Sequence, residues 1–135
     1  MVNKLDIQAL FRATKDVFRG SVLNKLNELV NYQYPQILED GATITWDMKK
    51  GYNADITLGD NRTLVVSGLT KGDYGTIVIR QDNVGSRTLT LPSNSKVSGG
   101  GGGAISLSSA ANAIDMATLY YDGTTIWWNL ATNFS

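Results

Sequence analysis

The sequence contains neither cysteine nor histidine among its 135 residues. Without cysteine the chain has no disulfides, thiolate metal sites or thiol nucleophiles, and its redox compartment stays undetermined. Without histidine it lacks the base of Ser–His–Asp and Cys–His sites, together with the commonest zinc ligand. These absences, and the lack of a nucleophile-elbow motif, argue against an enzyme. We accordingly expect no cofactor and no metal.

Charge of either sign is not in excess, since 12 Lys and Arg balance 12 Asp and Glu. This balance argues against a broad electrostatic surface for nucleic acid or acidic lipid. No apolar run approaches the roughly 20 residues of a membrane span. The first residues also lack the continuous apolar core of a signal peptide. We therefore expect a soluble, unprocessed chain that is long enough for one domain.

Residues 3–33 carry apolar side chains at helical spacing. Gly20 and Ser21 interrupt that pattern with a typical helix stop and a typical N-cap, which predicts two helices or one kinked helix. The mildly basic segment suits docking on another protein or self-association, and its candidate contact residues are Leu10, Phe11, Val17, Phe18, Leu23, Leu26 and Val30. The apolar seam is too short for a coiled coil. These helices pack either on the rest of this chain or on another chain.

From residue 42 onward the apolar period changes to two. The stretch "ATITWDM" places Ile44, Trp46 and Met48 on one face. Similar alternation continues through "ADITL", "RTLVVSG", "GTIVIRQ", "RTLTLP", "AISLS", "AIDMATLYYDG" and "TTIWWNLA", separated by turns rich in Asn, Asp and Gly. The pattern predicts a mainly β fold, a jelly-roll-like antiparallel β-sandwich of about eight strands. We expect an N-terminal helical segment at 1–40 and the β domain at 41–135.

Five consecutive glycines, residues 99–103, admit three interpretations: a linker, a phosphate-binding loop, or a turn inside one domain. The dinucleotide fingerprint requires a helix after the glycines, whereas "AISLS" alternates like a strand. A linker requires a complete unit on each side, and the apolar strands after the run are too short to fold alone. The run is therefore predicted to be an internal loop between "TLTLP" and "AISLS".

Aromatic side chains are the candidate binding residues, namely Trp46, Tyr120, Tyr121, Trp127 and Trp128. Neighbours on a strand point to opposite faces, so one member of each adjacent pair should be in the core. The other member is exposed, covered by the helices, or part of a subunit interface. An exposed Trp or Tyr can stack on a sugar ring, and the same residues are enriched at protein interfaces. We favour the interface, because the sequence marks no pocket.

Several spaced pieces of residues 41–134 carry a family resemblance. They are "NRTLVVSG", G-x-R-T-L-T-L-P, the glycine run, "AANAID" and "YYDGTTIWWNL". In these pieces the chain resembles the small β domains of bacteriophage tail fibres, head fibres and spikes. The resemblance implies a β-sandwich on a virion surface, at the capsid or the tail, that is made in the host cytoplasm and is commonly a homotrimer. It implies other virion proteins as partners and brings no catalytic residues.

Three functions compete on this basis. The first, which we favour, is a non-enzymatic virion protein: a short fibre, spike or vertex decoration that attaches by its N-terminal helices and displays the β domain for host attachment. The second is a module that recognises a cell-surface glycan through exposed Trp and Tyr. The third is a hydrolase of cell-wall polysaccharide, which would need two facing carboxylates that sequence spacing does not reveal.

Overall fold

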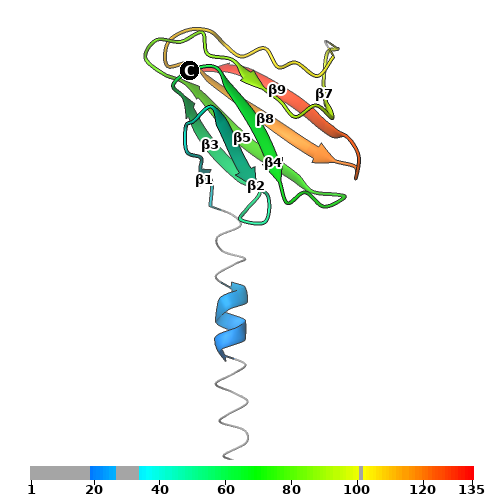
Figure 1. Ribbon diagram of the computed structural model, residues 1–135. Helices are drawn as coiled ribbons and strands as arrows, with labels where there is room; N and C mark the ends of the chain where they lie inside the picture. Colours follow the sequence, from blue (N-terminus) through cyan, green and yellow to red (C-terminus); the bar gives the residue numbers. More distant parts are fainter. Residues whose placement is uncertain (1–18, 27–33, 101) are drawn as a thin grey trace, which may run out of the picture. The chain divides into compact units, whose positions relative to one another are not determined.

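The computed structural model describes residues 19–26, 34–100 and 102–135. The chain divides into two compact units, Met1–Asn31 and Tyr32–Ser135. In the first unit residues 19–26 form a helix (Figure 1). Within the described ranges, no helix has the length and apolar character that a membrane span needs.

The helix runs through Gly20 and Ser21, so the predicted separation into two helices at these residues is wrong, and the alternative of one kinked helix stays a prediction. Gly20 does not take the left-handed backbone conformation that ends many helices. A glycine in the interior of a helix lowers helix stability by only about 1 kcal/mol relative to alanine, so a helix can continue past it when the neighbouring residues favour helix.

The second unit is built from strands. In chain order they are β1 (Gln36–Ile37), β2 (Thr43–Asp47), β3 (Asn53–Leu58), β4 (Arg62–Ser67), β5 (Tyr74–Gln81), β6 (Leu89–Thr90), β7 (Ser95–Val97), β8 (Ile114–Tyr121) and β9 (Ile126–Phe134). A six-stranded sheet has the order β1-β3-β5-β8-β9-β7, and a three-stranded sheet has the order β2-β4-β6 (Figure 1). Strand β1 precedes residue 41, where the sequence placed the start of the β domain.

Successive strands from β1 to β7 alternate between the two sheets. Each short turn carries the chain across to the opposite sheet, so the next strand of the same sheet runs parallel to the previous one. Accordingly β1, β3 and β5 pair in parallel, as do β2, β4 and β6, and β7 pairs in parallel with β9. Among the described strands, only the β5–β8 and β8–β9 pairings are antiparallel.

The predicted antiparallel jelly roll is therefore wrong in its strand pairing. A parallel pair needs a crossover of a dozen or more residues, and here the intervening strand of the other sheet supplies it. Period-two alternation reports which face of a strand is buried. The turn residues report where the strand ends. Neither signal says which sheet the next strand joins.

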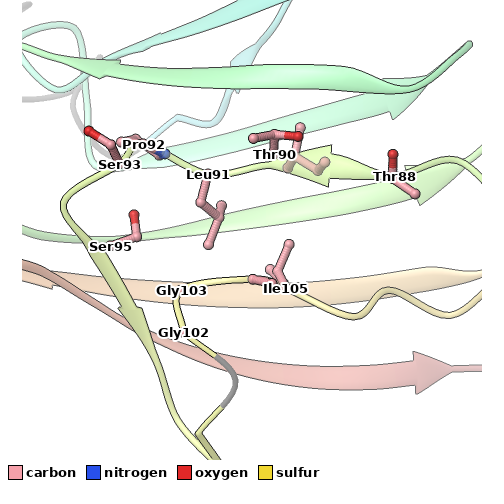
Figure 2. A pocket seen from close by; sticks show the side chains of 11 residues that line it. Thr88, Thr90, Leu91, Pro92, Ser93, Ser95, Gly102, Gly103 and Ile105 are labelled. Carbon is pink, nitrogen blue, oxygen red and sulfur yellow. The ribbon is translucent and has the colours of Figure 1, made fainter.

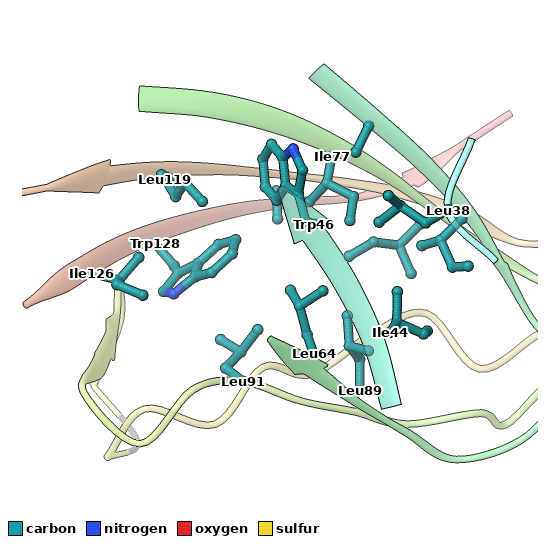
Figure 3. Close-up of a cluster of buried hydrophobic side chains, with 14 of the residues drawn as sticks. Leu38, Ile44, Trp46, Leu64, Ile77, Leu89, Leu91, Leu119, Ile126 and Trp128 are labelled. Atoms are coloured by element: carbon teal, nitrogen blue, oxygen red, sulfur yellow. The ribbon is translucent and has the colours of Figure 1, made fainter. Parts of the chain in front are cut away.

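Both sheets contribute to one hydrophobic core, in which side chains point into the space between the layers (Figure 3). Trp46 and Leu64 come from the smaller sheet, and Ile77, Leu119 and Trp128 come from the larger one. The predicted core face of residues 42–48 is confirmed, with burial nearly complete at Ile44, Trp46 and Met48. Trp46 donates its indole N–H to the carbonyl of Gly51 at 3.4 Å, and Trp128 donates to Ser95 Oγ at 2.9 Å.

The predicted strand "AISLS" has no ladder partner in the structure. The alternation of this segment still reports which side chains are buried, because Ile105 and Leu107 are partly buried against the core. The preceding glycine run lies inside the second unit, after β7, as the sequence predicted. Gly102 and Gly103 have left-handed φ values of 70° and 87°, which L-residues with a Cβ rarely adopt. A Cβ on Gly103 would also lie 2.6 Å from the carbonyl oxygen of Ser95.

Candidate binding surface

Three aromatic side chains lie side by side on the outer face of the larger sheet. Tyr74 of β5 is the ladder partner of Tyr120 of β8, and Tyr120 is the ladder partner of Trp127 of β9. Directly opposed residues in a sheet project from the same face. The side chains are 66%, 49% and 49% exposed, respectively. We call Tyr74, Tyr120 and Trp127 the aromatic row.

Asp122 fixes the indole at one end of the aromatic row. Its Oδ2 accepts the Trp127 Nε1–H at 2.8 Å. Its Oδ1 accepts the backbone N–H groups of Thr124 and Thr125, which closes the β8–β9 turn. Together these donors, the Thr125 amide above all, lower the pKa of the Asp122 carboxyl. The carboxylate is therefore ionised at neutral pH and holds the Trp127 ring in one orientation.

The two ends of the row differ in chemistry. Beyond Tyr74, the ring of Tyr52 stacks with a centroid separation of 5.8 Å and an interplanar angle of 20°. Beyond Trp127, Lys96 of β7 is its ladder partner and is exposed. The row therefore begins at a stacked tyrosine pair and ends at an ammonium group.

A second apolar area occupies the opposite end of the same sheet face. We call it the aliphatic patch, and its residues are Ile37, Val78, Ile114, Met116 and Phe134. Ladder pairings run across the sheet through this area. Ile37 pairs with Asp55, Asp55 pairs with Val78, and Val78 pairs with Met116. On the next pair of strands, Ile114 pairs with Phe134. Ile37 is 79% exposed and Phe134 is 48% exposed. A polar band separates the patch from the aromatic row, and its residues are Asn53, Thr76, Thr118 and Asn129.

The outer face of the smaller sheet has a different composition. Its exposed positions on β2 and β4 are Thr43, Thr45, Thr63 and Val65. A face of this kind, mostly hydroxyl groups, is typical of a sheet surface in contact with water. The larger sheet therefore presents the unusual surface, since exposed contiguous apolar side chains mark interaction sites.

A groove of about 400 Å³ lies between residues 88–93 and residues 102–105 (Figure 2). Leu91 and Ile105 point toward one another across it, and hydroxyl groups of Thr88, Thr90, Ser93 and Ser95 line its sides. No charged side chain lines this groove. It therefore lacks an ionisable acid or base for hydrolysis.

Several strand and turn carboxylates are tied to arginines. Arg62 pairs with Asp40 at 2.7 Å, Arg80 with Asp55 at 2.8 Å and Arg87 with Asp82 at 2.9 Å. The hydrogen bond from Arg87 lowers the pKa of Asp82 to about 2. In the described part of the chain, no three acidic side chains gather in a way that could hold a metal ion. These carboxylates connect turns and strands.

The structure separates the aromatic residues that the sequence singled out. Trp46 is fully buried, which corrects its candidacy as a binding residue, and Trp128 is 3% exposed. Tyr121 is half-buried and donates its hydroxyl to the carbonyl of Gly123 at 2.8 Å. Tyr120 and Trp127 remain exposed and adjacent. The Trp127/Trp128 pair divides between surface and core as predicted, whereas Tyr121 is only partly buried against the core.

Sequence reasoning missed Tyr74, Tyr52 and Lys96. Tyr74 opens the stretch "YGTIVIRQ" on the face opposite Ile77 and Ile79, so its exposure could have been read from the alternation. Its position beside Tyr120 could not, because that position depends on β5 pairing with β8.

The predicted docking residues of the helical segment are only partly described. Leu23 and Leu26 lie in the helix 19–26 and are 51% and 49% exposed. Residues i and i+3 lie on one helix face, so these leucines form a small exposed apolar face. The other predicted residues lie outside the described residues, namely Leu10, Phe11, Val17, Phe18 and Val30.

Comparison with known families gives one match. Residues 51–126 match the family described as "Putative phage tail fibre C-terminal domain". The matched range begins before β3 and ends at the first residue of β9, so it includes Tyr74 and Tyr120 and stops just before Trp127. No curated protein and no solved structure matches the chain.

Proposed function

Because the chain belongs to the family of phage tail fibre C-terminal domains, we propose that it is a self-associating tail fibre component that displays its β domain for host attachment. The family makes it a phage structural fibre protein of the virion tail and implies other virion proteins as partners. The proposal adds four points: assembly as a homotrimer, attachment through the N-terminal helices, display of the β domain for host attachment, and a structural, non-enzymatic role.

The aliphatic patch is the observation that carries the proposal of self-association. The patch has two exposed apolar side chains, Ile37 and Phe134, and three partly exposed ones, Val78, Ile114 and Met116. Contact of these side chains with water is unfavourable, and burial against an identical copy removes that contact. Closed symmetric assembly buries the same patch on each copy. The Arg80–Asp55 pair within the patch is already neutralised, so its burial would leave no unpaired charge.

Attachment through the helical segment is supported by Leu23 and Leu26. Their exposed face is too small to bind on its own, and a partner helix or a groove of another virion protein would cover it. Replacing both leucines with Lys should abolish incorporation into particles and leave the fold of the β domain intact. Incorporation is measured by complementing a phage that lacks this chain.

Self-association is tested on the full chain by native mass spectrometry. The wild type should give a trimer at micromolar concentration, and the double variant Ile37→Glu/Phe134→Glu should give monomer. Val65→Glu is the matched control, because Val65 is 41% exposed on the outer face of the smaller sheet. A wild-type monomer, or a double variant that assembles like the control, contradicts the proposal.

Glycan recognition by the aromatic row is a second candidate function. Exposed Tyr and Trp rings stack on sugar rings, and the bond between Asp122 and Trp127 holds one ring in place before a ligand arrives. A glycan array should show binding by the wild type that Trp127→Ala abolishes. Thr118→Ala, a substitution in the adjacent polar band, is the control and should bind normally. Equal binding by Trp127→Ala contradicts this candidate.

In a purely structural role the protein does not cleave the host surface to which it binds. Host envelope incubated with the full chain should release no reducing sugar above the level of a buffer control. Sustained release that scales with protein concentration would overturn the non-enzymatic part of the proposal.

A further inference from the structure

Lys96 is the cation closest in register to the aromatic row. It lies opposite Trp127 in the β7–β9 ladder, and Val97 lies opposite Trp128. Since Trp128 points into the core, Lys96 and Trp127 project together from the outer face. Neighbouring strands of a sheet lie roughly 4.8 Å apart, so the Lys96 side chain leaves the sheet next to that of Trp127.

The charged side chains around Trp127 differ in the hydrogen bonds and ion pairs that they form. The Asp122 carboxylate accepts three hydrogen bonds, from Trp127 Nε1 and from the amides of Thr124 and Thr125. Among the described residues, Lys96 forms no ion pair. Lys71, between β4 and β5, lies along the backbone of Gly123 in the β8–β9 turn; within the described ranges it forms no ion pair, and its charge contributes to the lowered pKa of Asp122.

From this arrangement we propose that the aromatic row binds an anionic saccharide, with a sugar ring against Trp127 and Tyr120 and the anion at Lys96. The inference rests on the second candidate function above and names the ligand class of that site. An ammonium and a carboxylate or phosphate attract each other as opposite charges in addition to their hydrogen bond, and charge-assisted hydrogen bonds are roughly twice as strong as bonds between neutral groups. An ammonium without a carboxylate partner, beside a stacking surface, therefore selects sugars that carry a carboxylate or a phosphate.

Asp122 contributes by positioning rather than by contact with the anion. Its oxygens are directed at the turn amides and the indole, so these three donors partly offset the repulsion between its negative charge and an anionic ligand. The carboxylate thus orients the ring on one side while the ammonium of Lys96 binds on the other. Replacing Asp122 with Asn keeps one acceptor and adds a donor, so the orientation of Trp127 and the ligand affinity should both change.

The test measures binding of the full chain by isothermal titration calorimetry. The probes are a polyuronate, the same polymer after reduction of its carboxyl groups, a phosphodiester-linked polymer and a neutral polysaccharide. An anionic probe should bind about tenfold more tightly than its neutral counterpart, as expected for one charged contact. Polyuronate binding identifies a carboxylate as the anion, and binding of the phosphodiester polymer alone identifies a phosphate.

Lysine variants separate charge from stacking. Lys96→Met should remove the preference for the anionic probe, and Lys96→Arg should keep it. Lys25→Met, which removes one positive charge from the helix 19–26, should leave it unchanged. Rising salt should weaken the anionic contact in the wild type more than in Lys96→Met.

The failures are distinguishable. Equal affinity for the polyuronate and its reduced form, or a preference that survives Lys96→Met, overturns the anionic ligand and leaves glycan recognition standing. Absence of binding to every probe overturns the glycan candidate together with this inference, while self-association of the fibre component remains a separate question.

Discussion

Tyr120 and Trp127 are ladder partners across β8 and β9, and each leaves 49% of its side chain exposed. Their chain neighbours, Leu119 and Trp128, are also ladder partners, and both are buried in the core. One antiparallel pairing thus places a hydrophobic pair inside the domain and an aromatic pair on its surface. The same backbone register that stabilises the fold therefore aligns the candidate binding rings.

Trp127 and Trp128 should respond oppositely to truncation. Trp128→Ala removes a buried indole and its hydrogen bond to Ser95, so we expect a loss of about 3–5 kcal/mol in the free energy of unfolding. Trp127→Ala removes an exposed ring and one surface hydrogen bond, so the loss should stay below about 1 kcal/mol. Urea unfolding followed by fluorescence measures both values, at one protein concentration because assembly shifts apparent stability.

Trp128→Phe is the control for lost volume. It keeps most of the buried ring and loses the N–H donor, so its stability should lie between the wild type and Trp128→Ala. If Trp127→Ala and Trp128→Ala destabilise the chain equally, the assignment of one ring to the core and the other to the surface is wrong.

The core could be predicted from the sequence because burial follows a local pattern. Ile44, Trp46 and Met48 alternate with polar residues, and a strand with that alternation has one apolar face whatever it pairs with. The direction of pairing could not be predicted, because β2 and β3 are joined by a short turn that suits a hairpin as well as a crossing between sheets. The parallel order depends on contacts between segments far apart in the chain.

The candidate site was predictable only in part for the same reason. The opposed faces of Trp127 and Trp128 follow from their adjacency, but the choice of which indole is buried depends on where the second sheet lies. Lys96 falls in a stretch that reads as a turn, and it becomes a ladder partner of Trp127 only because β7 joins the edge of the larger sheet.

Two neighbouring glycines of the run should differ in their tolerance of alanine. Gly102→Ala imposes strain at a φ of 70° in open space, so we expect a loss of about 1–2 kcal/mol. Gly103→Ala adds to similar strain a contact of 2.6 Å between the new Cβ and the carbonyl oxygen of Ser95. The second variant should therefore be clearly less stable in urea unfolding. Equal stability of the two variants would show that the Ser95 backbone moves away from the new Cβ without a loss in the free energy of unfolding.

The buried carboxylate of Asp115 should hold two distant backbone segments. It accepts hydrogen bonds from the amide of Ser108 at 2.6 Å and the amide of Asn133 at 2.9 Å. Asp115→Ala leaves both amides without this acceptor, so we expect a loss of about 2–3 kcal/mol. Ser108→Ala is the control, since it removes only the hydroxyl bond to Asp115. Hydrogen exchange should accelerate at residues 108 and 133 in Asp115→Ala and remain slow in the control.

Acid should weaken the chain through Asp82. The hydrogen bond from Arg87 lowers the pKa of this carboxyl to about 2, assisted by the amides of Gly85 and Val84, whereas an unfolded Asp titrates near pH 3.9. A folded-state pKa below the unfolded value stabilises the fold above about pH 4, and that stabilisation is lost as the pH falls toward 2. The free energy of unfolding should therefore decline over this interval.

Asp82→Asn removes the titrating group and should flatten this part of the pH profile, so that wild type and variant converge in stability as the pH approaches 2. Arg87→Met removes the first cause of the pKa shift and should flatten the profile to a smaller extent, because the two backbone amides still bind the carboxylate. Urea midpoints measured between pH 5 and pH 2 give the three profiles. Parallel profiles for wild type and Asp82→Asn would show that the Arg87–Asp82 pair does not contribute to acid sensitivity, since the difference between them isolates the titration of this one carboxyl.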